Sequence, residues 1–238
     1  MMYDNSLARL KKIQQCIILI TIIFPALSVI IFVAAQWPQY WKWIATEDTP
    51  MTTLQVAVMY TIALVSWANA GLHYLRSPLV QAKLSNTAKS SRWLVFGCSF
   101  FWFALDDRFA IHERIRDSFL APRHISIPFL PIAAGDFVLL FYMAVGLFSL
   151  KWLLPIFRET KAIRNRFVAG VVVAALLIIV DAYDIHRLDI SIERLEQTVE
   201  EVLELIAQTL FLQGAIIAWF KSIADGIKAT DLINSEKF

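Results

Sequence analysis

The run CIILITIIFPALSVIIFVAA, residues 16–35, decides the class of protein to which this chain belongs. None of its twenty residues is charged. An α-helix rises about 1.5 Å per residue, so the run is long enough to cross the ~30 Å hydrocarbon core of a bilayer. Basic residues precede it, as in a secretory signal peptide, but the run exceeds the usual h-region of roughly 7–15 residues. We therefore expect a retained transmembrane helix.

Five more apolar stretches of similar length follow along the 238-residue chain. Hydrophobic residues make up 58% of it and charged residues 18%. An ordinary soluble domain has about 25% charged residues, so the composition argues against disorder and against a water-soluble globule. Only helices satisfy the backbone of such unalternating runs in lipid. We predict an all-α fold, a polytopic membrane helix bundle forming a single domain over residues 1–238, with six transmembrane helices at about 16–35, 51–75, 93–112, 137–154, 167–185 and 199–220.

The charges between the predicted spans are sorted by side. With the N-terminus in the cytoplasm, the cytoplasmic segments hold 15 of the 22 Lys and Arg residues but 5 of the 20 Asp and Glu residues; these segments are 1–15, 76–92, 151–166 and 221–238. Cytoplasmic loops of membrane proteins carry an excess of basic residues, so we expect a multi-pass protein of the bacterial inner membrane with both termini cytoplasmic. The basic residues form no long tract, so membrane lipids are the expected partners and nucleic acid is not indicated.

Other features of the sequence narrow the function classes. Residues 118–135 hold three prolines among apolar residues and are expected to form an outer lid lying on the membrane. Cys16 and Cys98 fall inside apolar runs, so we expect neither a disulfide framework nor a Cys/His zinc pattern. The sequence has no P-loop, no G-x-G-x-x-G run and no G-x-S-x-G elbow, which argues against nucleotide-binding and α/β-hydrolase classes.

Four carboxylates on four predicted spans lie at one depth in the membrane. Counted from the predicted cytoplasmic ends, they lie roughly 20–24 Å into a ~30 Å core, inside the outer leaflet. These residues are Asp106, Asp136, Asp181 and Glu204. A carboxylate in hydrocarbon is costly unless it is paired, protonated or metal-bound, and such acids are functional by default. Protons or a divalent cation could neutralise the layer, and so could the nearby arginines Arg108, Arg114, Arg187 and Arg194.

Carboxylate and imidazole side chains suit Zn, Mn or Fe, and helix bundles build such sites from facing helices. Two histidines each lie about one turn beyond an acid of the predicted layer. We therefore predict a divalent-metal site with ligands drawn from Asp106, His112, Asp181, Glu204, Asp107, Asp184, His186 and Asp136. Glu113 and Glu201 are the candidate catalytic bases, and Glu201 also has the spacing to close a capping box with Thr198.

The run DDRFAIHE at residues 106–113, together with EEVLE at residues 200–204, resembles a pattern in small bacterial polytopic membrane proteins of unassigned function. In those proteins an Asp/His-Glu motif ends one span and a Glu-Glu-x-x-Glu motif opens a later one. The resemblance covers the third and last predicted spans and implies a shared site without an assigned activity. At fold level the chain is also similar to membrane-embedded metal-dependent amidohydrolases such as alkaline ceramidases, although it lacks their H-x-x-x-H pair and has six predicted spans rather than seven.

Three functions fit this pattern. The first is a membrane-embedded, metal-dependent hydrolase of a lipid or lipid-linked substrate, in which a metal lowers the pKa of bound water and a spare carboxylate acts as base. The alternative is an oligomeric ion channel or transporter, or a membrane-disrupting effector, because acidic rings select cations and carboxylate–histidine chains relay protons. The third is a non-catalytic membrane scaffold with an ion-pair core. Conduction needs polar residues in the cytoplasmic half, where the sequence has Ser66, Asn69, His73, Gln208, Thr209 and Gln213.

Overall fold

The computed structural model describes residues 2–45, 48–76, 83–123, 137–181 and 190–235. Within these ranges the chain is largely helical and contains no strand, so the predicted all-α fold is confirmed. The α-helices are α1 (Met2–Gln36), α2 (Pro50–Arg76), α3 (Lys83–Phe109), α4 (Ile111–Ile115), α5 (Phe137–Phe157), α6 (Lys161–Asp181) and α7 (Ile190–Ser235). Three short helical turns accompany them: η1 (Tyr40–Trp43), η2 (Arg116–Leu120) and η3 (Ala121–Arg123).

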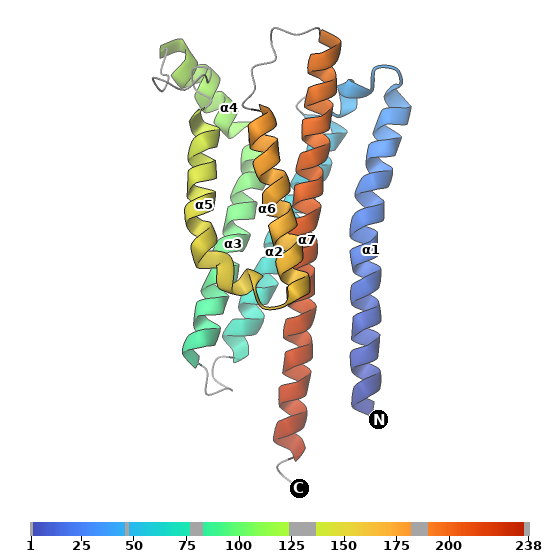
Figure 1. The fold of residues 1–238 in the computed structure, drawn as a ribbon, viewed down its shortest axis with the longest axis vertical. Coiled ribbons are helices and arrows are strands. Elements are labelled where there is room, and N and C mark those ends of the chain that lie inside the picture. Colours follow the sequence, from blue (N-terminus) through green and yellow to red (C-terminus); the bar gives the residue numbers. More distant parts are fainter. Residues whose placement is uncertain (1, 46–47, 77–82, 124–136, 182–189, 236–238) are drawn as a thin grey trace.

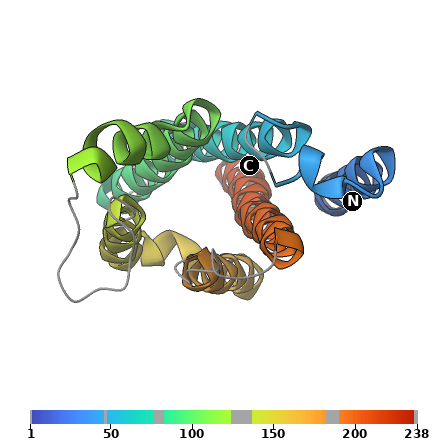
Figure 2. The ribbon, with the colours of Figure 1, turned by 90° about the horizontal axis from the view of Figure 1, so that it is seen from above.

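The long helices run side by side and form a ring (Figure 1 and Figure 2). Going round the ring, α2 contacts α3, α3 contacts α5, α5 contacts α6, α6 contacts α7, and α7 returns to α2. Helix α1 lies outside the ring, against α7. We name the two ends of the bundle by what they carry. The acidic end is where α1 finishes and α7 begins, at the top of Figure 1; the termini end is where α1 begins and α7 finishes.

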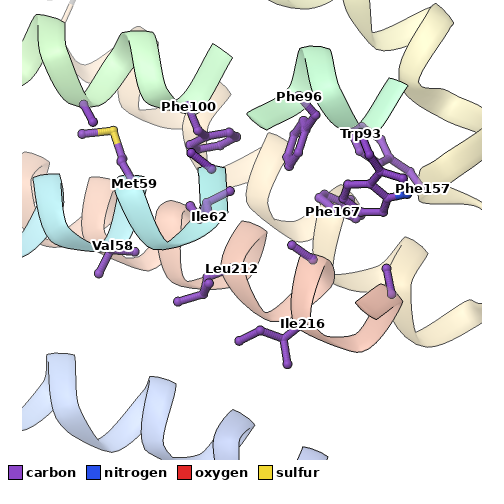
Figure 3. Close-up of a cluster of buried hydrophobic side chains, with 14 of the residues drawn as sticks. Val58, Met59, Ile62, Trp93, Phe96, Phe100, Phe157, Phe167, Leu212 and Ile216 are labelled. Atoms are coloured by element: carbon purple, nitrogen blue, oxygen red, sulfur yellow. The ribbon is translucent and has the colours of Figure 1, made fainter. Parts of the chain in front are cut away.

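Aromatic side chains of α3, α5 and α6 pack together in the core of the bundle (Figure 3). Phe157 of α5 stacks on Phe167 of α6 with ring centroids 4.0 Å apart, and Phe96 of α3 packs edge-on against both. Trp93 is fully buried beside Phe167. Such pairs stabilise a core by about 0.5–1.5 kcal/mol each beyond the area they bury. The cluster therefore joins α3, α5 and α6 at the end opposite to the predicted site.

Two glycines allow helices to approach closely. A Cβ added at Gly97 of α3 would lie 2.6 Å from the ring of Trp67 on α2. A Cβ at Gly214 of α7 would lie 3.0 Å from the ring of Phe167 on α6. Small residues at helix interfaces let a partner pack directly on the backbone, which is how helices associate in lipid. The positions of these two glycines therefore determine where α2 packs closely on α3 and where α6 packs closely on α7.

Three of the described helical segments are long and apolar enough to cross a membrane: Asn5–Gln36, Pro50–Arg76 and Ile190–Ala229. A shorter apolar segment, Ala144–Phe157, belongs to α5. Helix α1 leaves much apolar surface uncovered, since Phe24 and Ile30 are 60% and 62% exposed. Apolar faces of this extent are unfavourable in water and favourable against lipid chains. These helices support the prediction of a membrane protein.

Some of the predicted spans have different bounds in the structure. The span expected at 93–112 is interrupted, because α3 ends at Phe109 and Ala110 has a φ angle of 46°. The span expected at 199–220 is the middle of the longer helix α7, so Thr198 lies inside a helix and its Oγ1 donates to the Arg194 carbonyl rather than capping a helix start. The spans at 16–35, 51–75 and 137–154 lie within α1, α2 and α5, while the span at 167–185 and the lid at 118–135 are described only in part.

Candidate functional site

The break at Ala110 brings His112 back onto Asp106. A left-handed residue ends α3, because an L-residue does not continue a right-handed helix at positive φ. Beyond it, the backbone N–H of His112 donates to Asp106 Oδ1 (2.9 Å), and His112 Nδ1 donates to Asp106 Oδ2 (2.8 Å). The first bond satisfies an N–H group at the start of α4, as a capping side chain does. One carboxylate thus fixes both the short helix and the imidazole.

The histidine is held through one ring nitrogen, and its other nitrogen is available. Asp106 is only 5% exposed, and Tyr142 of α5 also donates to its Oδ1, at 3.4 Å. Because Nδ1 of His112 is bound to the carboxylate, Nε2 is the nitrogen that can take a proton or a metal. It lies 3.9 Å from Glu113 Oε1. A carboxylate that orients a histidine in this way is the usual support of catalytic and metal-binding histidines.

A second group of carboxylates lies where α7 faces α2 and α3. Gln55 Nε2 donates to Glu201 Oε2 (2.8 Å) and to the Glu201 carbonyl (3.1 Å). One turn beyond Glu204, Gln208 Nε2 donates to Glu204 Oε1 (2.9 Å). Asp107 is close enough to both glutamates for their charges to interact. Neighbouring residues on a helix point about 100° apart, so Asp106 and Asp107 belong to different groups.

The predicted metal ligands are therefore divided. Asp106 and His112 pair at the start of α4 with the predicted base Glu113 beside them, whereas Asp107 is close enough to Glu204 of α7 for their charges to interact. Among the described residues, no group of three or more His, Cys, Asp or Glu side chains has an arrangement that could hold a metal ion. Four predicted ligands lie outside the description, and their role stays a prediction: Asp136, Asp184, His186 and the side chain of Asp181.

A polar hollow of about 330 Å³ opens at the acidic end, beside Glu113. It is lined by Asp48, Asp107, Arg108, Phe109, Ala110, Glu113, Arg114, Asp117 and Ser118. The side chain of Arg116 donates to Asp117 Oδ1 (2.7 Å), and this hydrogen bond holds the pKa of Asp117 below its usual value. Phe109, Ile115 and Phe119 are exposed around the same segment. The hollow thus has charges of both signs inside and apolar side chains beside it.

Two of the four arginines that the sequence suggested for neutralising the acids bind other partners. Arg108 Nη1 binds Asp48 Oδ1 (2.7 Å), and the guanidinium of Arg194 lies 4.2 Å from the centre of the Trp41 ring. Arg187, which the sequence also suggested, is outside the described residues. In the described part of the chain, Glu201 and Glu204 receive hydrogen bonds from amides rather than from arginines. An ion-pair core of the kind expected for a scaffold is therefore not formed around these two glutamates in the region described.

Two residues of the site are absent from the sequence-based prediction. Gln55 donates to Glu201, and a signal for it exists, because an amide within an apolar span usually hydrogen-bonds to a neighbouring helix. Tyr142 donates to Asp106, and nothing in the sequence points to it. Tyrosine is common near membrane surfaces, and its contact with Asp106 depends on how α5 packs against α3.

A family model described as "Domain of unknown function (DUF8692)" matches residues 19–219. The match covers well over half of the chain, so the chain belongs to this family. The matched range contains both groups of carboxylates. No curated protein and no solved structure matches the chain.

Proposed function

We propose that this member of the DUF8692 family is a metal-dependent hydrolase of a bacterial inner membrane, which cleaves a lipid or a lipid-linked substrate at the outer surface. The observation that carries the proposal is the pair formed by Asp106 and His112. The buried carboxylate binds Nδ1 of the imidazole at 2.8 Å, and Nε2 lies near Glu113, which lines a polar hollow. A general base or a metal-binding histidine needs this kind of support.

The proposal includes six spans with both termini in the cytoplasm. Six crossings are supported by the three long apolar segments and by α3, α5 and α6, which complete the ring with α2 and α7. The orientation is supported by the 15 Lys and Arg residues in the segments that the sequence assigns to the cytoplasm. With this orientation the acidic end is outside, and the hollow lies at the outer boundary of the bilayer, within reach of lipid headgroups.

The chemistry of His112 and Glu113 suits hydrolysis. One of these two groups takes a proton from water while the water oxygen forms a bond to the carbonyl carbon of the substrate. The same proton then passes to the leaving oxygen or nitrogen as its bond to that carbon breaks. The Asp106 carboxylate stabilises the imidazolium form of His112 during this step. Arg108 and Arg114 line the hollow and supply positive charge where the carbonyl oxygen becomes negative.

A divalent metal, when bound, would lower the pKa of the attacking water. Nε2 of His112 and the carboxylate of Glu113 are the described groups that suit Zn, Mn or Fe. Catalytic metal sites commonly have about three protein ligands, so the proposal requires at least one more. The candidates are the predicted ligands whose side chains lie outside the description: Asp136, Asp181, Asp184 and His186.

A lipid substrate is favoured by the surroundings of the hollow. Its volume of about 330 Å³ is that of a small ligand site, which suits a headgroup rather than a whole lipid. Phe109, Ile115 and Phe119 are exposed next to it and would contact acyl chains. The arginines of the hollow suit a phosphate group near the scissile bond. A soluble polar substrate would not need the apolar side chains.

The test compares metal content and hydrolysis in three proteins purified in detergent: wild type, His112→Ala and Asp225→Asn. Asp225 is the matched control, because it is a carboxylate at the termini end that binds Lys221 (2.6 Å). Wild type and Asp225→Asn are expected to hold stoichiometric Zn, Mn or Fe and to release products from labelled phospholipids or lipid-linked substrates. His112→Ala is expected to lose the metal and to lose about 100-fold or more of the hydrolysis rate.

The outcomes separate the parts of the proposal. Hydrolysis by a metal-free protein would support the Asp106–His112 pair as a general base and would contradict the proposed role of a metal. A folded wild-type protein without metal and without hydrolysis of any substrate in the panel would overturn the hydrolase proposal. Equal loss in His112→Ala and Asp225→Asn would mean that the effect comes from folding rather than from the site.

A further inference from the structure

Helices α2 and α7 pack side by side and run in the same direction (Figure 1). Polar contacts join them over their shared length. The contacts are Gln55 Nε2 to Glu201 Oε2 (2.8 Å), Asn69 Nδ2 to the Ala215 carbonyl (3.1 Å) and His73 Nε2 to Ser222 Oγ (3.4 Å). The partners are 146, 146 and 149 residues apart, so the two helices keep nearly one register. From Glu201 to Ser222, α7 rises about 31 Å at 1.5 Å per residue, which matches the ~30 Å hydrocarbon core.

We call the buried polar residues of this interface the polar seam: Gln55, Ser66, Asn69 and His73 of α2, with Gln208 and Ser222 of α7. Each is at most 7% exposed. The α2 members lie on one helix face, because their spacing follows whole turns of 3.6 residues. Residues of α2 and α7 that are 146 positions apart lie at the same level along the bundle. Gln208 is therefore level with Ile62, between Gln55 and Ser66. The seam therefore has a polar side chain at least every two turns through the whole bundle.

Two oxygens of the seam are buried without a hydrogen-bond donor in the described part of the chain: Asn69 Oδ1 and Gln208 Oε1. The amide nitrogens beside them are already used, on the Val65 and Ala215 carbonyls and on Glu204 respectively. Buried acceptors of this kind usually bind ordered water. Lipid supplies no water to them, so water that satisfies these oxygens must lie between the helices.

Ser66 connects the two oxygens along the seam. It is fully buried and lies about 4.5 Å along the helix axis from Asn69 and about 6 Å from the level of Gln208. Its Oγ donates to the Ile62 carbonyl (2.7 Å) and keeps lone pairs that can accept from water. Water molecules bound by Gln208, Ser66 and Asn69 would thus be near enough to bind one another.

The two ends of the seam carry groups that exchange protons with water. At the acidic end Gln208 binds Glu204, whose charge interacts with those of Asp107, Glu200 and Glu201. At the termini end, the imidazole of His73 binds Ser222. The charged groups that face it are Glu159, Lys89, Arg76 and Lys221. A proton passes along hydrogen-bonded water without losing a hydration shell, so the proton is the ion that these spaced polar side chains favour.

We infer that the polar seam holds a file of water molecules and conducts protons across the membrane between the acidic end and the termini end. Each water accepts a proton from one neighbour and donates another to the next, so only O–H bonds form and break and no co-reactant is consumed. The direction follows the electrochemical gradient. This activity is separate from the proposed hydrolysis, since the seam shares no residue with the Asp106–His112 pair.

The test measures proton flux into liposomes of phosphatidylcholine and phosphatidylglycerol that contain the full chain and an internal pH-sensitive dye. A potassium gradient with valinomycin sets the driving potential. Wild type is expected to conduct well above protein-free vesicles. Gln208→Leu and Asn69→Leu are each expected to lower the flux about tenfold or more, because each removes a hydrogen-bonding site from the file. Thr61→Leu is the matched control, since Thr61 is an exposed polar residue of α2 that binds only its own helix, at the Ala57 carbonyl.

Two results of the flux assay would overturn the inference. One is a wild-type flux equal to that of protein-free vesicles. The other is unchanged flux in folded Gln208→Leu and Asn69→Leu, which would make the seam a helix-joining contact only. If the leucine variants do not fold, Gln208→Met replaces them as a side chain of similar length. Hydroxyl-radical footprinting of the wild type gives a second readout. Met59 lies near the seam and is only 3% exposed. Oxidation of Met59 would support internal water, and protection of Met59 from oxidation would overturn the inference.

Discussion

Carboxylates at the two ends of the bundle are held in different ways. At the termini end, Glu159 lies between two lysines, 2.8 Å from Lys89 Nζ and 3.6 Å from Lys221 Nζ. At the acidic end, the buried Asp106 is held by the imidazole of His112 and by a tyrosine hydroxyl. Lysines give up their protons only at high pH, whereas imidazole exchanges them near neutrality. The first arrangement suits a structural ion pair, and the second suits acid–base chemistry.

The comparison teaches that the count of acids alone is a poor guide to function. Glu159 is as well buried as Asp106, since their side chains are 7% and 8% exposed. Its two lysines supply a fixed compensating charge, so we assign it no chemical role. Glu201 and Glu204 receive amide donors instead, which stabilise a carboxylate without cancelling its charge. The kind of group that binds each carboxylate therefore distinguishes the two regions better than the burial of the carboxylate does.

The change with the largest expected effect is Asp106→Asn. The asparagine amide can present only one acceptor atom, so its NH2 group would face His112 and favour the wrong tautomer. We expect hydrolysis and metal affinity to fall about 10–100-fold, as is typical when the support of a metal-binding histidine is removed. Turnover assays and metal titration in detergent would measure both. Full activity in Asp106→Asn alongside loss in His112→Ala would show that the carboxylate is not needed.

Glu159→Gln probes the other end of the comparison. The substitution leaves Lys89 and Lys221 without their shared carboxylate in a partly buried position. We expect the free energy of unfolding to fall by about 2 kcal/mol, between the values for exposed and buried pairs, with hydrolysis unchanged. Unfolding in mixed micelles measures the stability. Lys161→Gln, an exposed neighbour, serves as control and should change it by less than about 0.5 kcal/mol. A drop in activity at unchanged stability would contradict the structural role.

Ala110→Gly sharpens the comparison by relaxing the break on which the acidic end depends. Ala110 has a φ angle of 46°, which costs an L-residue about 1–2 kcal/mol and glycine very little. Because glycine also gains entropy in the unfolded chain, we expect a net stabilisation of roughly 0.5 kcal/mol. The same unfolding assay would detect it. Ala110→Val should instead destabilise, since β-branched residues tolerate positive φ least; equal stability of the two variants would argue against the left-handed turn.

The smallest effect on the free energy of unfolding is expected for Arg108→Ala. The Arg108–Asp48 pair is short, at 2.7 Å, but its side chains are 51% and 79% exposed. Solvent and salt screen such a pair, so the free energy of unfolding should change by about 0.5 kcal/mol or less. Unfolding at low and high salt would measure it. A loss as large as that of Glu159→Gln would remove the distinction between an exposed pair and a buried one.

Part of the site could be predicted from the sequence. The motif at residues 106–113 contains Asp106, His112 and Glu113, and the structure places these side chains close together, because residues this near in sequence cannot lie far apart. The separation of Asp107 from Asp106 was not predicted. It depends on which helices pack against the two sides of α3, and this is set by tertiary packing. The predicted layer treated the acids as one group, whereas helical phase and packing direct them to different partners. Tyr142 could not be found, because its role depends on the approach of α5.

By itself the sequence determined the all-helical class, the apolar lengths of α1, α2 and α7, and the uneven distribution of basic and acidic residues among the segments between apolar stretches. These are properties of local stretches, and the length and polarity of a stretch do not depend on its neighbours. The tertiary structure decided the left-handed turn at Ala110 and the register of α2 against α7. Both depend on packing, because a strained residue persists only where its surroundings hold it, and two helices can slide until side chains from both fix them.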